Sequence, residues 1–409
     1  MKDFELYQQI LGLSEPWHVD SVSLKLAEKT VEVRVGYADT LWGCPQCQQR
    51  MHLHDYQERR WRHLDSCQFQ TIIVSRVPVV ECPVHGSQTV AVPWAEKYAR
   101  FTRLFERFAI DVMLECSITG ACAILGISWD EADGIKQRAV KRGLARKQPT
   151  VMARLCVDEK GMGQGHDYLT IVARVSEERT TVEYVGEERE KESLDAFWQS
   201  LSAEQLAGVE AVAMDMWEPF VRSTLAHVPG ATSKIVHDPF HLVKHMNEAV
   251  NDVRKSEHRR LLAAGDETLT GTRQLWLYGL ENVPASQGPR FEQIYHINLQ
   301  TSRAWMIKEM FRSFWLCDTV KQAKGYFAQW YGWAIRSRLE PVKKVARMCK
   351  NHLDHILTFF THRLTNGPIE GLNNKIQGLI KKAYGFRNKE RFKTDIFFHL
   401  GGLDLYPTQ

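Results

Sequence analysis

Several features that would assign the chain to a familiar class are missing from its sequence. Its 409 residues contain no apolar run close to the roughly 18–20 residues that a membrane-spanning helix needs. The first residues, MKDFELYQQILGL, carry acids and have no long apolar centre, so they do not look like a signal peptide. Internal repeats and low-complexity segments are also lacking. We therefore expect a cytoplasmic protein with no membrane partner.

Disulfide bonds and extensive disorder are not expected either. Nine cysteines, an odd number spread unevenly along a cytoplasmic chain, argue against a disulfide framework. With 44% hydrophobic and 25% charged residues, the composition is that of a folded protein. The chain is too long for one ordinary core, so we expect about two to four domains.

One stretch of the sequence has no acidic residue and is rich in basic residues. Between Gly134 and Val157 the sequence has no Asp or Glu, while Lys and Arg recur. A second basic cluster lies near the C-terminus. The net charge of +4 alone predicts no partner. Two such clusters leave phosphate binding and ordinary solvated helix faces both open.

Zinc-ligand residues occur in two matched turns. The segment from CPQC to CPVHG contains Cys44 and Cys47, then Cys82 and His85 at the same spacing. Zn²⁺ takes four thiolate or imidazole ligands, and a C-P-x-C turn supplies two of them. The stretch FQTIIVSRVPVV between the turns favours strands, as in a zinc ribbon. The pattern predicts one structural Zn²⁺, with spare ligands if His85 is not one: Cys67, His52, His54 and His63.

The residues after this segment follow a helical pattern. FTRLFERFAIDVMLECSI places apolar side chains at steps of three and four residues, which indicates an amphipathic helix. A short helix, a glycine turn at Gly126 and a longer helix opened by Ser128 then resemble a helix-turn-helix. Any helical hairpin with a glycine looks similar, so the adjoining basic tail adds to the case for DNA binding. In such a motif the second helix enters the major groove, and here it would carry Lys136, Arg138, Lys141 and Arg142.

Further along, the pattern changes to that of a mixed sheet. Apolar, β-prone runs occur in RLCVDEKG, DYLTIVARVS, TTVEYVGEE, VEAVAMD and SKIVHD, with helical patterns between the last three. Three hairpin-connected strands followed by helix, strand, helix and strand are typical of the RNase H-like fold. From about Met246 to Arg363 the pattern is helical and rich in tryptophan, and a last amphipathic helix follows RLTNGPIEG.

Two of these strands end on a carboxylate. Asp158 closes the first and Asp215 the fourth, and those strands are neighbours in an RNase H-like sheet. Asp215 alone could simply cap the next helix, because Pro219 suits a first helical turn. Glu370, at the start of the last long helix, could supply a third carboxylate. Carboxylates gathered in this way favour Mg²⁺, and two ions roughly 3.5–4 Å apart can act on a phosphodiester.

With these residues the chain resembles a bacterial insertion-sequence transposase of the DDE type, specifically the ISL family (type three). The resemblance covers nearly the whole chain and rests on these motifs: CPQC…CPVHG, the helix-turn-helix, VDEKGMGQGHDYLTIV, AVAMDMWEPF, IVHDPFHLVKH and TNGPIEGLNNKIQGLIKKAYGFRN. It implies that Asp158, Asp215 and Glu370 are catalytic and bind two Mg²⁺ (or Mn²⁺) ions. It also implies an all-helical insertion between the second aspartate and the glutamate.

Neighbouring residues are expected to have less direct roles. Strand alternation turns Glu159 to the opposite face from Asp158, which leaves it a minor part. The family pattern places Asp238, His241 and His245 beside the site, where they would brace the sheet or contact DNA. For His241, a packed core histidine and a functional one are both open.

The resemblance implies an enzyme that binds terminal inverted repeats, cleaves DNA and transfers the freed 3′ end to double-stranded target DNA. Holding two ends at once would require a homodimer or a larger synaptic complex, in the nucleoid of a bacterial cell. The alternatives are a zinc and helix-turn-helix regulator without catalysis, and an RNase H-like nuclease that cuts without joining. We expect four basic residues of the last helix to lie along the backbone of the donor DNA: Lys375, Lys381, Lys382 and Arg387.

The expected architecture is a multidomain α+β chain. An N-terminal zinc ribbon and a helix-turn-helix precede an RNase H-like, retroviral-integrase-type α/β catalytic domain, which an all-helical insertion interrupts. The expected boundaries are 1–35 for an N-terminal segment, 36–92 for the ribbon, 98–148 for the helix-turn-helix, 151–246 and 364–400 for the catalytic domain, and 247–363 for the insertion.

Overall fold

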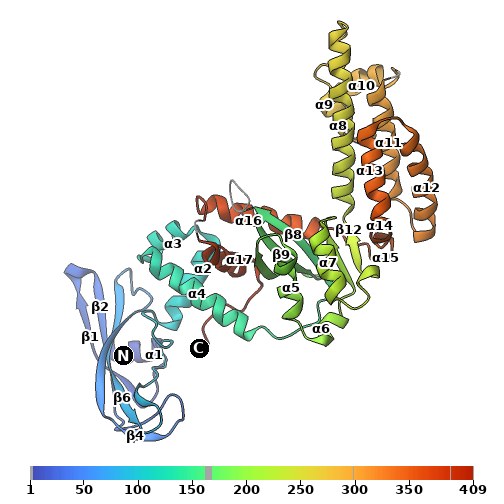
Figure 1. Ribbon diagram of the computed structural model, residues 1–409. Coiled ribbons are helices and arrows are strands. Elements are labelled where there is room, and N and C mark those ends of the chain that lie inside the picture. The colour runs from blue at the N-terminus through green and yellow to red at the C-terminus, as the bar shows by residue number, and fades with distance from the viewer. Residues whose placement is uncertain (1–2, 162–167, 298, 387, 409) are drawn as a thin grey trace. The chain divides into compact units, whose positions relative to one another are not determined.

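The computed structural model describes residues 3–161, 168–297, 299–386 and 388–408 (Figure 1). Contacts divide the chain into two compact units, Met1–Lys147 with Phe397–Gln409, and Gln148–Ile396. Within the described ranges, every helix is too short or too polar to span a bilayer. Each unit has its own sheet and its own core.

A five-stranded sheet lies at the centre of the described part of the first unit. The strands are ordered β1-β2-β6-β5 with β7 paired to β6, and β2 runs parallel to β6 while the other pairs are antiparallel. Their bounds are β1 Trp17–Lys25, β2 Thr30–Tyr37, β5 Asp55–Arg62, β6 Gln70–Cys82 and β7 Gly86–Thr89. Helix α1 Asp3–Ile10 precedes the sheet, and β3 Leu41–Gly43 pairs with β4 Arg50–His52 in a separate hairpin.

The core of this sheet is built from tryptophan rings. Trp94 packs against Trp17 and Trp61, with ring centroids 5.0 Å and 5.4 Å away. All three side chains are buried, together with Trp42. Large aromatic rings in edge-to-face contact fill the space beside the sheet and stabilise it by burying apolar area.

Three helices follow the sheet in the first unit: α2 Arg103–Glu115, α3 Ile118–Leu125 and α4 Trp129–Arg146. Each begins at a hydroxyl N-cap, and Ser128 at the start of α4 forms a full capping box with Glu131. Helix α3 ends at Gly126, whose φ of 64° lies in the left-handed region that glycine tolerates. The predicted turn at Gly126 and the predicted helix start at Ser128 are therefore confirmed.

The second unit contains a mixed sheet, ordered β10-β9-β8-β11-β12 in its described residues. The bounds are β8 Arg154–Gly161, β9 Tyr168–Val175, β10 Thr180–Glu187, β11 Ala211–Met214 and β12 Ile235–His237. Strands β10, β9 and β8 form an antiparallel meander, whereas β8, β11 and β12 run parallel. Every residue of β11 and β12 is buried, and a strand covered on both faces has a continuous apolar sequence.

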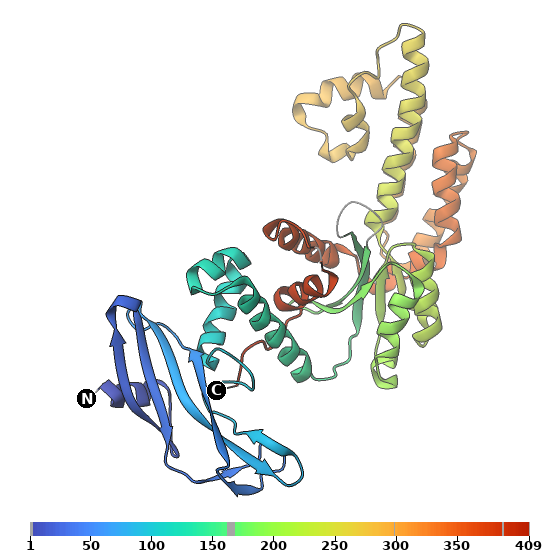
Figure 2. The same cartoon turned by 60° about the vertical axis from the view of Figure 1, so that its left-hand side comes forward.

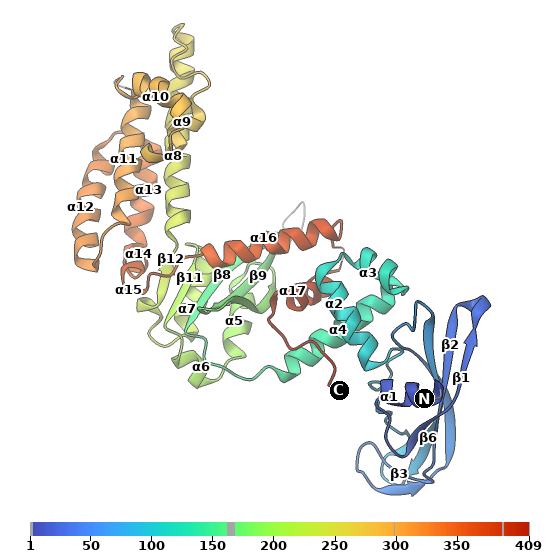
Figure 3. The same cartoon turned by 180° about the vertical axis from the view of Figure 1, so that it is seen from behind.

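Helices cover both sides of this sheet. They are α5 Lys191–Gln199, α6 Ala203–Ala207, α7 Glu218–His227 and α16 Gly367–Lys382. The last helix, α17 Lys389–Leu400, crosses the boundary between the units, and its Phe398 is buried in a core of the first unit. Figures 2 and 3 show α16 on one side of the sheet, with α5 and α7 on the other. Leu194, Phe197 and Trp198 of α5 are buried in the core beneath the strands.

A long helical segment separates β12 from α16 along the chain. Its helices are α8 Pro239–Ala263, α9 Arg273–Leu277, α10 Gly288–Tyr295, α11 Gln300–Phe314, α12 Val320–Arg336, α13 Glu340–Asn351, α14 Leu353–Leu357 and α15 Phe359–His362. Helices α8, α11, α12 and α13 lie side by side (Figures 1 and 3). Trp276, Trp305 and Trp330 are buried in their shared core, so these tryptophans have a packing role.

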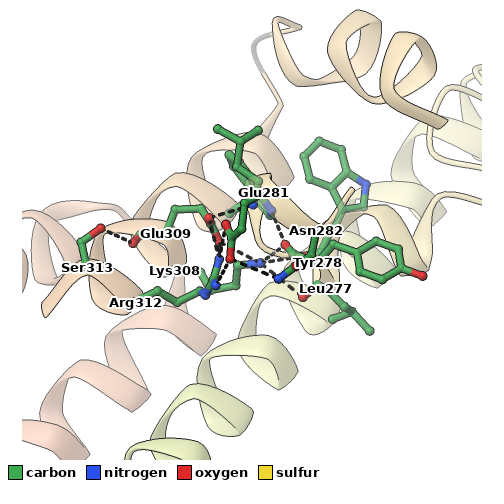
Figure 4. Close-up of polar contacts among 11 residues, drawn as sticks. Leu277, Tyr278, Glu281, Asn282, Lys308, Glu309, Arg312 and Ser313 are labelled. Atoms are coloured by element: carbon green, nitrogen blue, oxygen red, sulfur yellow. Dashed lines mark hydrogen bonds and ion pairs between the residues drawn. The ribbon is translucent and has the colours of Figure 1, made fainter. Parts of the chain in front are cut away.

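Lys308 is a fully buried cation within this helical segment (Figure 4). Its ammonium group donates to the backbone carbonyl of Trp276 at 3.2 Å and to that of Tyr278 at 2.5 Å. Burial lowers the pKa of Lys308 to about 8, against the opposing effect of the Glu309 carboxylate. The side chain satisfies carbonyl groups at the end of α9 that have no partner within the helix.

Candidate functional site

Three aspartates lie next to one another where the parallel pairing of β8, β11 and β12 ends. Strand β8 itself continues to Gly161, paired with β9, so the expectation that Asp158 closes its strand is wrong. The register pairs Met214 of β11 with Val157 of β8 on one side and with His237 of β12 on the other. Because the strands are parallel, the next residue of each strand reaches the same edge of the sheet. These next residues are Asp158, Asp215 and Asp238. The carboxyl edge of parallel strands is where open α/β sheets bind ligands.

The first two carboxylates are held by the backbone just beyond them. Asp158 Oδ1 accepts from the Glu159 N–H at 2.8 Å, and Asp215 Oδ1 accepts from the Met216 N–H at 2.6 Å. Each bond fixes the side chain with one oxygen and leaves Oδ2 for other partners. Both side chains are half-buried, so they remain accessible from the edge of the sheet.

Helix α16 brings Glu370 to the same edge. Asn373, one turn after Glu370, donates from Nδ2 to Asp158 Oδ2 at 2.7 Å. Residues three positions apart share a helix face, so Glu370 and Asn373 face the same side. Just before the helix, Asn366 donates its backbone N–H to Asp238 Oδ1 at 3.0 Å. These two bonds attach α16 to β8 and to the end of β12.

Asn373 is not among the residues that the sequence predicts for the site. Its Oδ1 is buried and has no hydrogen-bond partner among the described residues, and the same is true of both amide atoms of Asn366. A buried amide oxygen without a partner suits a water molecule or a hard cation. The signal that could have identified Asn373 is its spacing of three residues from Glu370, on the same helix face.

The charges at this edge repel one another. Burial raises the pKa of Asp158, and the carboxylates of Asp215 and Glu370 raise it further, while the Glu159 N–H and His241 oppose them. A bound divalent cation stabilises the anionic form that burial and like charges disfavour. Carboxylates with an amide oxygen form the hard donor set that Mg²⁺ or Mn²⁺ prefers, so these residues fit a divalent cation.

The three carboxylates are more widely spaced than the ligands of a closed metal site. In the described ranges, the group whose ligand atoms all lie within 4.8 Å of one another consists of Cys44, Cys47, Cys82 and His85. The carboxylates at the sheet edge do not form such a group. A pair of ions about 3.5–4 Å apart spreads its ligands more widely than one ion does, so the open arrangement is compatible with two ions.

Asp238 caps a helix and braces the site. It is 2% exposed, and its Oδ2 accepts from the backbone N–H groups of Phe240 and His241 at the start of α8. The same oxygen lies 3.2 Å from His241 Nδ1. The hydrogen bond to Asp238 raises the pKa of His241, and the other carboxylates at the edge act in the same direction. The structure therefore joins Asp238 and His241 in one hydrogen-bonded group.

Two other predicted neighbours have partners of their own. His245 Nδ1 lies 3.3 Å from a carboxylate oxygen of Glu248, one turn further along α8. Glu159 forms an ion pair with Arg189 at 2.6 Å. The Arg189 guanidinium in turn lies 4.0 Å from the ring centroid of Trp217. Glu159 is thus engaged outside the hydrogen bonds that link Asp158 to α16.

The basic side chains of α4 that are predicted to contact DNA are mostly ion-paired or buried within the first unit. Arg138 forms an ion pair with Glu106, and Arg142 Nη2 lies 3.3 Å from the same carboxylate. Lys136 is 5% exposed, whereas Lys141 is exposed. Contact of these four side chains with DNA stays a prediction, and Lys141 has the geometry that best suits it.

The basic side chains of α16 face solvent. Lys375, Lys381 and Lys382 are exposed, while Ile369, Leu372 and Ile376 are buried on the opposite face. The predicted apolar and basic faces of this helix are therefore confirmed. Arg387, the other basic residue predicted to contact DNA with this group, lies outside the described residues.

The cysteine turns of the first unit come together as the spacing predicts. Cys47 Sγ lies 3.7 Å from Cys82 Sγ, and His85 Nδ1 lies 3.8 Å from Cys44 Sγ and 3.4 Å from Cys82 Sγ. A tetrahedral Zn²⁺ with bonds of about 2.3 Å to sulfur and about 2.0 Å to nitrogen requires edges of about 3.8 Å and about 3.5 Å. The four ligand atoms therefore fit one Zn²⁺.

The spare zinc ligands lie outside this group. Cys67 is exposed, and His63 is buried with its Nδ1 2.9 Å from Thr102 Oγ1. Burial alone would raise the pKa of Cys82, but the N–H groups of Val84 and His85, the His85 ring and Cys47 lower it to about 6. A thiol that readily gives a thiolate suits a zinc ligand.

Comparison with protein families gives matches along most of the chain. A profile of ISL3-type DDE proteins, described as "Transposase", matches residues 155–396. A profile for the "Helix-turn-helix domain of transposase family ISL3" matches residues 90–140, and one for the "zinc-finger of transposase IS204/IS1001/IS1096/IS1165" matches residues 40–85. The three matches cover the sheet edge, the α3–α4 pair and the cysteine turns.

Two curated relatives are similar over most of their length. The transposase for insertion sequence element IS1557 of Mycobacterium tuberculosis is 26% identical over 423 aligned positions, which cover 95% of this chain and 94% of the relative. The transposase for insertion sequence element IS1001 of Bordetella parapertussis is 24% identical over 356 positions, covering 85% and 86%. The similarity thus includes both compact units.

Proposed function

Since the chain belongs to the ISL3 family of transposases, we propose that its DNA cleavage and strand transfer take place at the sheet edge of Asp158, Asp215 and Glu370. The protein is a DNA transposase, an enzyme that binds, cleaves and transfers DNA. The register of β8 and β11 supports this assignment, because the first two carboxylates directly follow the paired residues Val157 and Met214. The Asn373 bond to Asp158 supports the third, because it holds the helix of Glu370 there.

We assign the divalent ions of the reaction to these three carboxylates. When bound, a pair of Mg²⁺ or Mn²⁺ ions would activate the attacking hydroxyl and stabilise the leaving oxygen of the phosphodiester. Asp158 and Asp215 present their second oxygens in fixed directions, because backbone N–H groups hold the first ones, and Asp158 Oδ2 also accepts from Asn373. Glu370 enters from another element, so the site is complete only when α16 is docked on the sheet.

One set of residues can serve both chemical steps. Water first attacks the phosphodiester at the transposon end, and the freed 3′ hydroxyl then attacks a phosphodiester of the target. Each step forms one P–O bond and breaks another, so no covalent intermediate with the protein is needed. Asp158, Asp215 and Glu370 stay in place between the steps, and the exposed lysines of α16 hold the donor backbone beside them.

We further propose that the sheet of the second unit is an RNase H-like catalytic fold, residues 151–246 and 364–400. The meander β8–β10 followed by the parallel strands β11 and β12 supports this interpretation. The helices between β12 and α16 would then be the insertion, residues 247–363. The remaining proposed domains are the N-terminal segment 1–35, the ribbon 36–92 and the helix-turn-helix 98–148.

The first unit would recognise the DNA ends. We propose that Cys44, Cys47, Cys82 and His85 hold one structural Zn²⁺, and that the ribbon and the α3–α4 pair read the terminal inverted repeats. Two ends must be held together for transfer, so the active form would be a homodimer or a larger complex on the DNA of the nucleoid. Phosphate contacts from exposed basic side chains such as Lys141 would fix the register of the protein on the duplex.

A strand-transfer assay with the terminal repeats of the element tests the catalytic assignment. Asp215→Ala and Glu370→Gln are each expected to lower cleavage and joining by about a thousandfold, or about 4 kcal/mol of transition-state stabilisation. The physical reason is the loss of an anionic oxygen ligand from a site that needs divalent ions. Binding to the end duplex, measured without divalent ions, should change little.

Glu159→Gln is the matched control, because this carboxylate neighbours Asp158 but pairs with Arg189. It should retain activity near that of the unmodified protein. Near-full activity of Asp215→Ala would overturn the assignment. Cleavage by the unmodified protein without any joining would favour the nuclease alternative.

A further inference from the structure

An exposed tyrosine in the first unit has a backbone conformation that favours glycine or asparagine. The Ala99 N–H donates to the Glu96 carbonyl at 3.0 Å, which closes a turn around Lys97 and Tyr98. Tyr98 has a φ of 65°, as the third residue of a type II turn does, and that position favours glycine or asparagine. Its side chain is 78% exposed, so packing does not explain the choice of tyrosine.

The residues after the turn are hydrogen-bonded to the neighbouring strand. The Arg62 N–H donates to the Arg100 carbonyl at 2.9 Å, which joins the residues after the turn to the end of β5. Arg59 Nη2 lies 3.4 Å from the Ala99 carbonyl, and the Ala99 side chain is buried. A strained, exposed residue that its framework fixes in place is a common feature of ligand-contacting sites.

The hollow beside the turn is basic. It has a volume of about 480 Å³, and its lining includes Arg59, Arg60, Lys97, Tyr98 and Arg100. The Lys97 ammonium lies 5.1 Å from the Tyr98 ring centroid. Within the described part of the chain, Lys97 and Arg100 form no ion pair. Their charges are therefore available to an anion.

The one carboxylate lining this hollow does not cancel those charges. Glu96 is paired with Arg142, whose Nη2 lies 2.8 Å from Glu96 Oε2. Arg60 pairs with Glu32 at 3.3 Å, which leaves Lys97 and Arg100 as cations without an acidic partner among the described residues. Two such cations beside an exposed aromatic ring are complementary to a nucleic-acid backbone.

The basic hollow continues to the start of the predicted recognition helix. A second hollow of about 420 Å³ is also lined by Tyr98 and Arg100, together with Ser128 and Asp130 at the N-terminal end of α4. In a helix-turn-helix, residues at the start of the second helix approach base edges. Asp130 disfavours phosphate there, so the phosphate contacts belong on the Lys97 and Arg100 side.

We propose that the Lys97–Tyr98 turn and the basic hollow beside it form a DNA-contacting surface next to α4. This surface holds the sugar–phosphate backbone of the terminal-repeat duplex that α4 approaches. Lys97 and Arg100 contact phosphates, and the Tyr98 ring packs against a deoxyribose or an exposed base. The proposal rests on the transposase function but not on the catalytic assignment, because it concerns binding alone.

Tyr98→Gly separates DNA binding from the stability of the fold. Glycine adopts the positive φ without strain, so the variant should unfold at an equal or higher denaturant concentration and keep its zinc. Its affinity for a terminal-repeat duplex should nevertheless fall by about tenfold, because the aromatic ring no longer packs against the DNA. The measurement is fluorescence anisotropy with labelled duplex, in buffer without divalent cations, so catalysis does not contribute.

The double variant Lys97→Ala/Arg100→Ala tests the role of the two phosphate-binding side chains. Because two cations no longer neutralise phosphates, the slope of log affinity against log salt should become shallower by about 1.8, for terminal-repeat and random duplexes alike. The matched control is Lys25→Ala/Arg34→Ala, which removes the same charge from a half-buried and an exposed residue of the same unit that pair with Glu32. This control should leave the slope nearly unchanged.

Three results would overturn the proposal. The first is unchanged affinity of Tyr98→Gly for the duplex together with an unchanged salt slope of the double variant. The second is an equal change of slope in the control pair, which would indicate a general effect of net charge. The third is a changed oligomeric state at unchanged DNA affinity, which would assign the surface to a second copy of the chain.

Discussion

His63 links the acid stability of the first unit to one buried imidazole. It is 2% exposed and lies against Thr102, the N-cap of α2. Burial lowers its pKa to about 4, and Arg62 contributes to the lowering. A histidine in the unfolded chain has a pKa of about 6.5, so the unfolded chain binds the proton first as the pH falls. The stability due to neutral His63 is complete above that pH and is lost toward pH 4.

We therefore expect the free energy of unfolding to fall by up to about 3 kcal/mol between pH 6.5 and pH 4 through this group. Urea unfolding of the zinc-bound protein across this range measures the change. His63→Gln should show a shallower pH dependence, because glutamine does not titrate. Loss of zinc at low pH affects both proteins, so the difference between them isolates His63. Parallel curves would contradict the prediction.

Residues with a local signal could be predicted from the sequence, and residues with a distant partner could not. The matched turns of Cys44 and Cys82 define their spacing within a few residues, and the structure brings them together. In the sequence, Arg138 looks like any DNA-contacting arginine of a recognition helix. Its pairing could not be predicted, because its partner Glu106 lies on another helix. The hydrogen bond of Asn373 could not be predicted for the same reason, since its partner Asp158 is far away in sequence. The roles of the three carboxylates stay predictions.

At the scale of elements, the position of α16 depends on Asn373. Its hydrogen bond to Asp158 fixes both a carboxylate of β8 and the helix that carries Glu370. Asn373→Leu removes the donor but keeps a similar side-chain volume. We expect cleavage to slow by about tenfold to a hundredfold, the usual effect of losing a group that orients a metal ligand. The Mg²⁺ concentration for half-maximal rate should rise, while binding to the end duplex is unchanged.

Asn374→Leu is the matched control, since the next residue of α16 is also an asparagine but is exposed. Its cleavage rate and Mg²⁺ dependence should stay close to those of the unmodified protein. Equal effects of the two substitutions would mean that α16 is disturbed in general. No effect of Asn373→Leu would remove Asn373 from the site.

Elements were predictable where the chain follows one periodicity for its full length. Strands β8 to β12 and helices α3 and α4 lie where alternation, apolar runs and caps place them. The helical segment after β12 was predicted as helical, but not its division into separate helices. Those divisions depend on tertiary groups such as Lys308, which satisfies carbonyls at the end of α9 from another helix. A local pattern contains no information about such a partner.

At the scale of the whole molecule, the two candidate metal sites lie in different units. The carboxylates belong to the second unit, and the zinc ligands to the first. Cys44 follows β3, Cys82 ends β6 and His85 precedes β7. A bound Zn²⁺ would therefore join the β3–β4 hairpin to the β6–β7 turn. Such an ion contributes to the stability of the ribbon directly, because its ligands are brought together only in the folded state.

Chelation of zinc should consequently loosen one unit and spare the other. We expect faster amide hydrogen exchange in β3, β4, β7 and the end of β6, with unchanged exchange in β8, β11 and β12. Cys82→Ser should reproduce this pattern without a chelator, whereas Cys67→Ser, which alters an exposed cysteine outside the ligand group, should not. Exchange that rises equally in both units would show that the ion stabilises more than the ribbon. Exchange that rises in neither would mean that these four residues hold no structural zinc.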